Sequence, residues 1–280
     1  MQTPIKLHFV ENFTEGDTDE QLEAMKKYFD FVRLEEADVI YCGSIVKMSQ
    51  AINAKYSSNK PLVVYCWDYY KWAHNGASNF NWRQYAEFLK IADLIIVPSS
   101  SQQLRLKELL GLDSVVVKTG IKTYKHKVED KGFILDPVRY YPEENRTWAE
   151  EVAEELGIPI IHSEHQFTLE EFRELVATCT FMTCAYREAS TGGLTLMEGL
   201  NLGKPSLVSN SPYMGAHDYL GELGYYFQYD DKEDLKRQMF KLWTERPKID
   251  KIKVEKHLKE FSFDKMAKNL HSKICEALKK

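Results

Sequence analysis

The stretch that decides the fold runs from Tyr186 to Asn210 and reads YREASTGGLTLMEGLNLGKPSLVSN. Strand-forming residues precede it, and its Gly-Gly pair opens an apolar stretch with helical spacing. The helix is expected to end near Gly203-Lys204-Pro205, and the next residues favour a strand. Strand, glycine-containing loop, helix and strand in this order form a phosphate-binding layout, because free amide groups and the dipole at a helix start attract anions.

Outward from this stretch, short apolar strands alternate with amphipathic helices along the whole chain. In the first half we expect strands at 5–10, 38–42, 61–67, 94–97 and 115–117, with helices at 19–29, 45–54, 82–91 and 101–110. In the second half we expect strands at 132–135, 158–161, 180–184, 206–208 and 225–227, with helices between them and two more at the end. The alternation predicts an α/β protein with parallel, doubly wound sheets.

Residues 118–130 interrupt the alternation because they are polar, rich in lysine and without an apolar period. Such a segment is typical of a connection between domains. We therefore expect two Rossmann-like halves joined near residue 120. Ligands of such sheets bind beyond the carboxyl ends of the strands, and clefts between domains commonly hold small molecules.

Composition narrows the class of protein. The chain has 280 residues, 44% of them hydrophobic, and a formal net charge of −5, so its overall charge favours neither nucleic acid nor an anionic membrane. No apolar run approaches the roughly 20 residues that span a bilayer, and the N-terminus lacks a signal-peptide layout. The five cysteines form no Cys-x-x-Cys pair, which favours reduced thiols in a cytoplasmic protein.

A family resemblance rests on four segments in a fixed order. They are Thr119-Gly120-Ile121, residues 138–145, the run from Gly192 to Pro205, and residues 261–264. Together they resemble the retaining GT-B glycosyltransferases with a Glu-x7-Glu element, the group that includes glycogen and sucrose synthases. The resemblance implies the GT-B fold, with two Rossmann-like domains that face each other across a cleft and a C-terminal helix that returns to the first. It implies domains at 1–122 and 123–260, with residues 261–280 as the returning helix.

The implied reaction moves a sugar from a nucleotide-diphosphate sugar to an acceptor hydroxyl, with retention and without a metal or other cofactor. Negative charge grows on the leaving phosphate, and fixed dipoles and cations must stabilise it. The implied phosphate ligands are the Arg139 side chain and the amide groups of Gly193, Leu194 and Thr195. An ion pair with a nearby glutamate is the alternative for Arg139. The family's lysine position holds Glu144, so we expect Arg146, or Lys118 or Lys122 of the connection, to supply that charge.

Two carboxylates are implied to bind the donor. Glu198 matches the family's second glutamate and would accept hydrogen bonds from the ribose diol, unless it is an ordinary exposed helix residue. Glu188 lies ten residues earlier and would act at the donor sugar as a catalytic residue, whereas strict register places Ser190 there. The alternative for Glu188 is a salt bridge with Arg187. The backbone at Gly192 and Gly215 is expected to approach the donor sugar.

The acceptor is expected to contact the first half, at the end of its third strand. Asp68 would orient or deprotonate the acceptor hydroxyl, and Trp67 stands where many relatives carry a histidine. The expected acceptor-side residues are Asn12, Trp67, Tyr70 and His74. The aromatic rings there either stack on a ligand or form core and rim. The histidines lack metal-ligand spacing, so we expect no zinc site.

The nucleotide sugar is the partner that the resemblance implies, and the acceptor is open. A sugar, a small metabolite, a protein or a hydroxymethylated DNA base would fit, and no membrane insertion is expected. The rival functions are another sugar-nucleotide enzyme on the same fold, an epimerase or a phosphorylase, and a non-catalytic nucleotide-sugar-binding protein.

Overall fold

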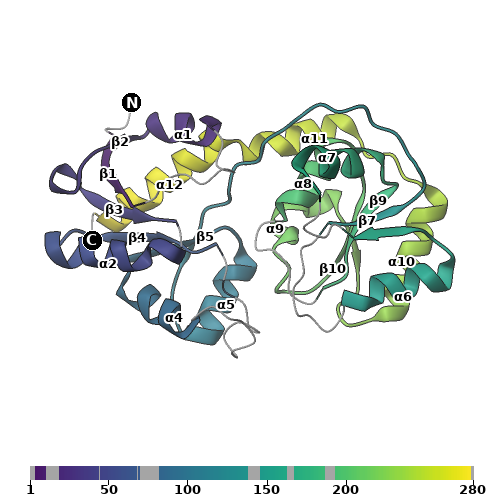
Figure 1. The fold of residues 1–280 in the computed structure, drawn as a ribbon, viewed down its shortest axis with the longest axis horizontal. Coiled ribbons are helices and arrows are strands. Elements are labelled where there is room, and N and C mark those ends of the chain that lie inside the picture. Colours follow the sequence, from purple (N-terminus) through teal and green to yellow (C-terminus); the bar gives the residue numbers. More distant parts are fainter. Residues whose placement is uncertain are drawn as a thin grey trace. The chain divides into compact units, whose positions relative to one another are not determined.

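A computed structural model of the chain describes residues 4–10, 19–43, 45–67, 69, 82–137, 146–162, 167–186 and 193–278. The chain divides into two compact units. Unit 1 comprises residues 1–120 together with 261–280, and unit 2 comprises residues 121–260. Each unit contains one sheet of parallel strands that is covered by helices (Figure 1).

Unit 1 contains a six-stranded sheet in the order β2-β1-β3-β4-β5-β6, and every neighbouring pair of strands is parallel. Its strands are β1 (Ile5–Phe9), β2 (Phe29–Phe31), β3 (Val39–Cys42), β4 (Leu62–Tyr65), β5 (Leu94–Val97) and β6 (Val115–Val116). Its helices are α1 (Asp19–Lys26), η1 (Leu34–Glu36), η2 (Ile45–Lys47), α2 (Met48–Ser58), α4 (Trp82–Ile91), α5 (Ser100–Leu110) and α12 (Phe263–Leu278). The short helix η4 (Lys259–Phe261) includes the last residues of unit 2 and the first of the returning segment.

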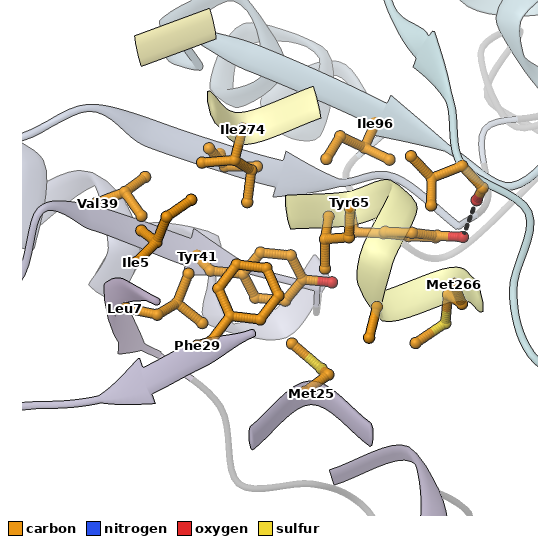
Figure 2. Close-up of a cluster of buried hydrophobic side chains, with 14 of the residues drawn as sticks. Ile5, Leu7, Met25, Phe29, Val39, Tyr41, Tyr65, Ile96, Met266 and Ile274 are labelled. Carbon is orange, nitrogen blue, oxygen red and sulfur yellow. Dashed lines mark hydrogen bonds between the residues drawn. The ribbon is translucent and has the colours of Figure 1, made fainter. Parts of the chain in front are cut away.

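The central strands β3 and β4 of unit 1 are buried on both faces. Along β4, Val63 and Tyr65 point into one apolar cluster while Leu62 and Val64 point into another. The first cluster, drawn in Figure 2, is covered by α1 and by α12, which lie side by side in Figure 1. The C-terminal helix therefore completes the core of the N-terminal sheet. Covering both faces explains why these strands read as nearly continuous apolar runs.

Unit 2 contains a five-stranded parallel sheet in the order β11-β10-β9-β7-β8. Its strands are β7 (Ile134–Asp136), β8 (Ile160–His162), β9 (Phe181–Cys184), β10 (Ser206–Ser209) and β11 (Tyr225–Phe227). Its helices are α6 (Arg146–Leu156), α7 (Leu169–Thr178), α8 (Leu194–Asn201), α9 (Ala216–Leu220), η3 (Gly221–Leu223), α10 (Lys232–Glu245) and α11 (Lys251–Leu258). The chain passes from β7 to β8 on one side and then to β9 on the other, so the topological switch point lies at β7.

The connection between the last strand of unit 1 and the first of unit 2, residues 117–133, forms no helix or strand. Its second part is fixed to unit 2. The buried ammonium group of Lys204 donates hydrogen bonds to the carbonyl oxygens of Glu129 (2.5 Å) and Cys179 (2.6 Å), and the Glu129 amide donates to the Ala177 carbonyl (3.1 Å). Burial lowers the pKa of Lys204.

The predicted class, two parallel α/β units, is confirmed, and one element was predicted wrongly. The helix expected at 19–29 ends at Lys26, and Phe29 begins the edge strand β2, where it pairs with Ile5. Phe29 continues the helical spacing of Leu22 and Met25, which misled the prediction. Burial of Phe29 on the sheet decides the structure instead. Among the helices of the described residues, none has the length and apolar character needed to cross a membrane.

Candidate functional site

The start of α8 is built around Gly193. This residue is the N-cap of the helix and has a left-handed backbone (φ 55°, ψ 27°), so no side chain caps the first turn. A Cβ atom at Gly193 would lie 3.0 Å from the Cα atom of Ala216, the first residue of α9. Glycine therefore meets two requirements here, a positive φ and a close approach of two backbones. Because Ala216 follows Gly215, the structure brings the predicted Gly193 and Gly215 segments together.

The first turn of α8 presents backbone amide groups. The Gly193 carbonyl accepts the Met197 amide (3.1 Å), so the amides that precede Met197 have no acceptor within the helix. Leu194 is 36% exposed and Thr195 is partly buried. Amide donors at the positive end of a helix dipole, close to the surface, favour an anionic group. Of the three predicted phosphate-binding residues, Leu194 and Thr195 lie where such a group can reach them, whereas Gly193 is buried.

The position of Glu198 is set by close packing of α8 on β9. A Cβ atom on the next residue, Gly199, would lie 2.1 Å from the sulfur of Met182 in β9, so the Met182 side chain fills the space that a larger residue at position 199 would need. Glu198 is partly buried. Burial raises the pKa of its carboxyl group, and the positive charge of Arg173 in α7 opposes that rise. The predicted ribose ligand is therefore a half-buried carboxylate with a cationic neighbour.

A polar network that the sequence analysis missed lies at the switch point of unit 2. Asp136 ends β7 and is buried, and its Oδ2 atom accepts hydrogen bonds from the Tyr186 hydroxyl (2.8 Å) and from Nδ1 of His162 (3.0 Å). Tyr186 follows β9 and His162 ends β8, so the network joins three strand ends. Nε2 of His162 also lies 2.8 Å from the Glu150 carboxylate in α6. The sequence signal was weak, a single polar residue at the end of each of two strands.

The network supports the segments that carry predicted site residues. The segment with Arg139 leaves β7 just after Asp136, and the segment with Glu188 leaves just after Tyr186. A buried carboxylate with two donors is a strongly constrained group, because leaving either donor unpaired is costly. The hydrogen bond between Tyr186 and Asp136 consequently holds the origins of these two segments together.

Among the residues that the structure describes, the predicted site residues Lys118 and Trp67 belong to unit 1. The Lys118 ammonium group lies 5.3 Å from the ring centroid of Phe261, in cation–π contact. Trp67 is partly buried, packs against the core cluster of Figure 2 and lies 4.6 Å, ring centroid to centroid, from Tyr65. Both have structural contacts in unit 1, and their predicted roles in phosphate and acceptor binding stay predictions.

The other predicted site residues fall outside the described part of the chain, apart from Arg146, which is the first residue of α6. Those outside are Asn12, Asp68, Tyr70, His74, Arg139, Glu188, Ser190 and Gly192. Within the described residues, no group of three or more His, Cys, Asp or Glu side chains is arranged to hold a metal ion.

Two Rossmann-like units with parallel sheets, the first completed by a C-terminal helix, make the GT-B fold of glycosyltransferases. The sequence matches no protein-family model and no curated protein. Solved structures match it over most of its length.

HepE of Anabaena, in complex with UDP and glucose, has a TM-score of 0.67 at 13% identity, over 97% of this chain and 100% of its own. The apo form of the lipopolysaccharide outer core galactosyltransferase WaaB has a TM-score of 0.64 at 14% identity, over 91% of this chain and 80% of its own. Sucrose-phosphate synthase of Thermosynechococcus elongatus has a TM-score of 0.64 at 11% identity, and the match covers 91% of this chain and 75% of that of the synthase. At such low identities the likeness shows the fold alone.

Proposed function

We propose that this protein is a glycosyltransferase that takes its sugar from a nucleotide-diphosphate sugar and transfers it to a hydroxyl group, with retention and without a metal ion. The observation that carries the proposal is the start of α8, where uncapped amides and the half-buried Glu198 lie on one short helix of a GT-B fold. The structures of HepE with UDP and with UDP-glucose support a nucleotide sugar as the donor class.

We assign the donor to unit 2. Its diphosphate binds the amides of Gly193, Leu194 and Thr195 and the Arg139 side chain, whose planar fork suits phosphate oxygens. Glu198 lies five residues after Gly193, about 7.5 Å along the helix axis. That separation lets one ligand place its phosphates at the helix start and its ribose hydroxyls at the carboxylate. Arg146 or Lys118 supplies the further positive charge that the family's lysine gives.

The reaction follows from where charge develops. The bond between the anomeric carbon and the phosphate oxygen breaks, and the diphosphate gains negative charge, which the helix amides and Arg139 stabilise. The acceptor oxygen bonds to the anomeric carbon from the face that the phosphate leaves, and its proton passes to a leaving phosphate oxygen. Glu188, or Ser190 in the alternative register, contacts the donor sugar, with the backbone of Gly192 and Gly215 beside it. Asp68 orients the acceptor hydroxyl.

A thermal-shift screen against nucleotide sugars tests the donor site. A ligand present at a hundred times its Kd adds about 2.7 kcal/mol to the free energy of unfolding. UDP-glucose and UDP are the first ligands to test. Glu198→Ala should abolish the stabilisation, whereas Glu154→Ala, at an exposed position on α6, should leave it unchanged. Full stabilisation of the Glu198→Ala variant would show that the donor site has been placed wrongly.

Mass spectrometry then tests catalysis with the donor that binds best. A transferase hydrolyses its donor slowly in water and forms a glycoside once an acceptor is supplied. An epimerase converts the donor sugar with no acceptor present, and a phosphorylase needs free phosphate. A protein that binds nucleotide sugar and shows none of these reactions is a binding protein, which would contradict the proposed enzyme.

A further inference from the structure

The imidazole ring of His162, the last residue of β8, lies between two carboxylates. Its Nδ1 atom lies 3.0 Å from Oδ2 of Asp136, and its Nε2 atom lies 2.8 Å from Oε1 of Glu150. The side chain of Asp136 is 1% exposed, that of His162 15% and that of Glu150 50%. Each nitrogen of one mostly buried ring therefore faces a carboxylate oxygen.

This arrangement favours the charged form of the ring. A neutral imidazole has one N–H group and one bare nitrogen, so either neutral tautomer would place a lone pair against a carboxylate. The imidazolium carries a proton on both nitrogens, and neighbouring carboxylates stabilise it. The Nε2 contact with Glu150 lacks the alignment of a hydrogen bond, so it is an ion pair alone. Loss of the proton turns one of the two attractions into a repulsion.

The two carboxylates lie on either side of one segment of the chain. Asp136 ends β7, and Glu150 lies in the second turn of α6. Residues 138–145 join this strand to this helix, and they include Arg139, the expected ligand of the diphosphate. The ring of His162 therefore links the residue before this segment to the helix after it.

We propose that His162, in its protonated form, is a positioning residue for the diphosphate of the donor. It holds the beginning of the segment 138–145 through Asp136 and the helix at its end through Glu150. The inference rests on the proposed function, since it takes Arg139 as a ligand of the diphosphate. His162 touches no part of the nucleotide in this scheme, because it acts through the segment that it holds.

The two contacts of the ring contribute unequally. The pair with Asp136 is buried, so its loss leaves an uncompensated charge in the interior, whereas solvent screens the half-exposed pair with Glu150. The Tyr186 hydroxyl donates to the same oxygen of Asp136 (2.8 Å) and orients that carboxylate. Within the described residues, the titratable groups around the ring are thus Asp136 of β7, Glu150 of α6 and, through Asp136, Tyr186 after β9.

The experiment measures the Kd of UDP-glucose between about pH 5.5 and 9, the range in which histidine titrates, for the unaltered protein and for His162→Gln. The diphosphate of UDP-glucose is esterified at both ends and keeps its charge over this range, whereas a terminal phosphate titrates at about pH 6. The unaltered protein should bind more weakly as the pH rises and the ring loses its proton. His162→Gln carries no charge, so it should bind about tenfold more weakly at the acidic end, with a Kd that varies little with pH.

His126 offers a matched control in the same unit. It is also a partly buried histidine that faces two carboxylates, since its Nε2 atom lies 3.8 Å from Glu170 and 3.6 Å from Glu174. His126→Gln should leave the pH dependence of the Kd unchanged. Glu150→Gln should weaken UDP-glucose binding only about twofold, because solvent screens that pair.

Arg139→Met tests the route by which His162 acts. In that background His162→Gln should add little further loss of UDP-glucose affinity, because both changes act on one ligand of the diphosphate. A full further loss would show that His162 acts elsewhere, and the inference would be overturned. A pH dependence of the Kd that survives unchanged in His162→Gln would overturn it as well.

Hydrogen exchange of the ligand-free protein separates this inference from the proposed function. The backbone amides of residues 138–149 should exchange faster in His162→Gln than in the unaltered protein at the same pH, and His126→Gln should not differ from the unaltered protein. Equal exchange in all three proteins would show that His162 does not hold the segment. If the unaltered protein fails to bind UDP-glucose, the proposed function is contradicted instead, and the exchange rates still show whether His162 holds the segment.

Discussion

Two helices that follow parallel strands, α5 in unit 1 and α8 in unit 2, begin in opposite ways. The Ser99 side chain caps α5 by accepting the Gln102 amide (3.2 Å), and its hydroxyl oxygen lies 2.9 Å from that of Ser101, all of them buried. Gly193 begins α8 with a left-handed backbone and no side chain to offer. The Ser99 side chain thus satisfies one first-turn amide of α5, whereas no N-cap side chain does so in α8.

The contrast holds within unit 2 as well. The long helices α7 and α10 are capped by the side chains of Thr168 and Asp231. Helix α8 has no side-chain N-cap, as is also true of α2 and α9, and it is the one of these that carries Glu198. The glycine at the start of α8 thus leaves its first-turn amides available to an anion, whereas Ser99 accepts one of the first-turn amides of α5.

The largest effect is expected at the two left-handed glycines Gly193 and Gly111, the C-cap of α5. Each has a positive φ, 55° and 69°, so alanine at either position costs about 1–2 kcal/mol of backbone strain. The free space around the two glycines differs. A Cβ atom at Gly111 would have no atom within 4 Å, whereas one at Gly193 would contact Ala216. Gly193→Ala should lose a further 1–3 kcal/mol or so from crowding, and with it the binding of UDP. Urea unfolding and UDP titration measure both.

Equal losses of unfolding free energy in Gly193→Ala and Gly111→Ala would mean that the contact with Ala216 relaxes freely. Unchanged UDP binding in Gly193→Ala would separate the geometry of the helix start from nucleotide binding. Either result would break the contrast between α5 and α8.

The next effect concerns two buried tyrosines near strand ends. The Tyr186 hydroxyl donates to the carboxylate of Asp136, and the Tyr65 hydroxyl donates to the Val117 carbonyl (2.6 Å; dashed in Figure 2). A hydrogen bond to a charged group contributes about 1.5–3 kcal/mol and one between neutral groups about 0.5–1.5. Tyr186→Phe should therefore destabilise the protein about twice as much as Tyr65→Phe.

The two phenylalanine variants should also differ in function. Only Tyr186→Phe loosens the switch-point network from which the segments of Arg139 and Glu188 leave, so it should weaken UDP binding and slow donor hydrolysis. Tyr65→Phe should lower the melting temperature and change neither. Loss of UDP binding in both variants would show that it follows stability rather than the network.

The two regions were also unequally predictable. Local signals mark α8, since the paired glycines, the apolar spacing and the Lys204-Pro205 stop all lie within some fifteen residues. The Ser99 cap of α5 is likewise local, because Ser99 directly precedes the helix in the sequence. Strand Phe29–Phe31 was missed because its spacing also suits a helix, and only pairing with Ile5 of a distant strand separates the two.

The network at the switch point was out of reach for a different reason. The role of Asp136 as a buried acceptor depends on Tyr186, fifty residues away in the sequence. It also depends on a strand order that places β8 and β9 on either side of β7. The predicted strand at 132–135 stops just short of Asp136. Nothing in the neighbourhood of Asp136 in the sequence distinguishes a buried acceptor of two hydrogen bonds from an exposed turn residue.

The smallest effect is expected at the side-chain caps, where Ser99→Ala on α5 is paired with Asp231→Ala on α10. Each removes one hydrogen bond to a helix amide, from Gln102 in one case and from Asp234 (2.9 Å) in the other. Loss of a cap costs about 1 kcal/mol, which urea unfolding resolves. In both helices the capped amide is bonded to the protein's own side chain and not to a ligand. UDP should therefore bind these variants with unchanged Kd. Weaker UDP binding after Ser99→Ala would imply that the start of α5 also takes part in nucleotide recognition. The proposed difference in role between the starts of α5 and α8 would then be wrong.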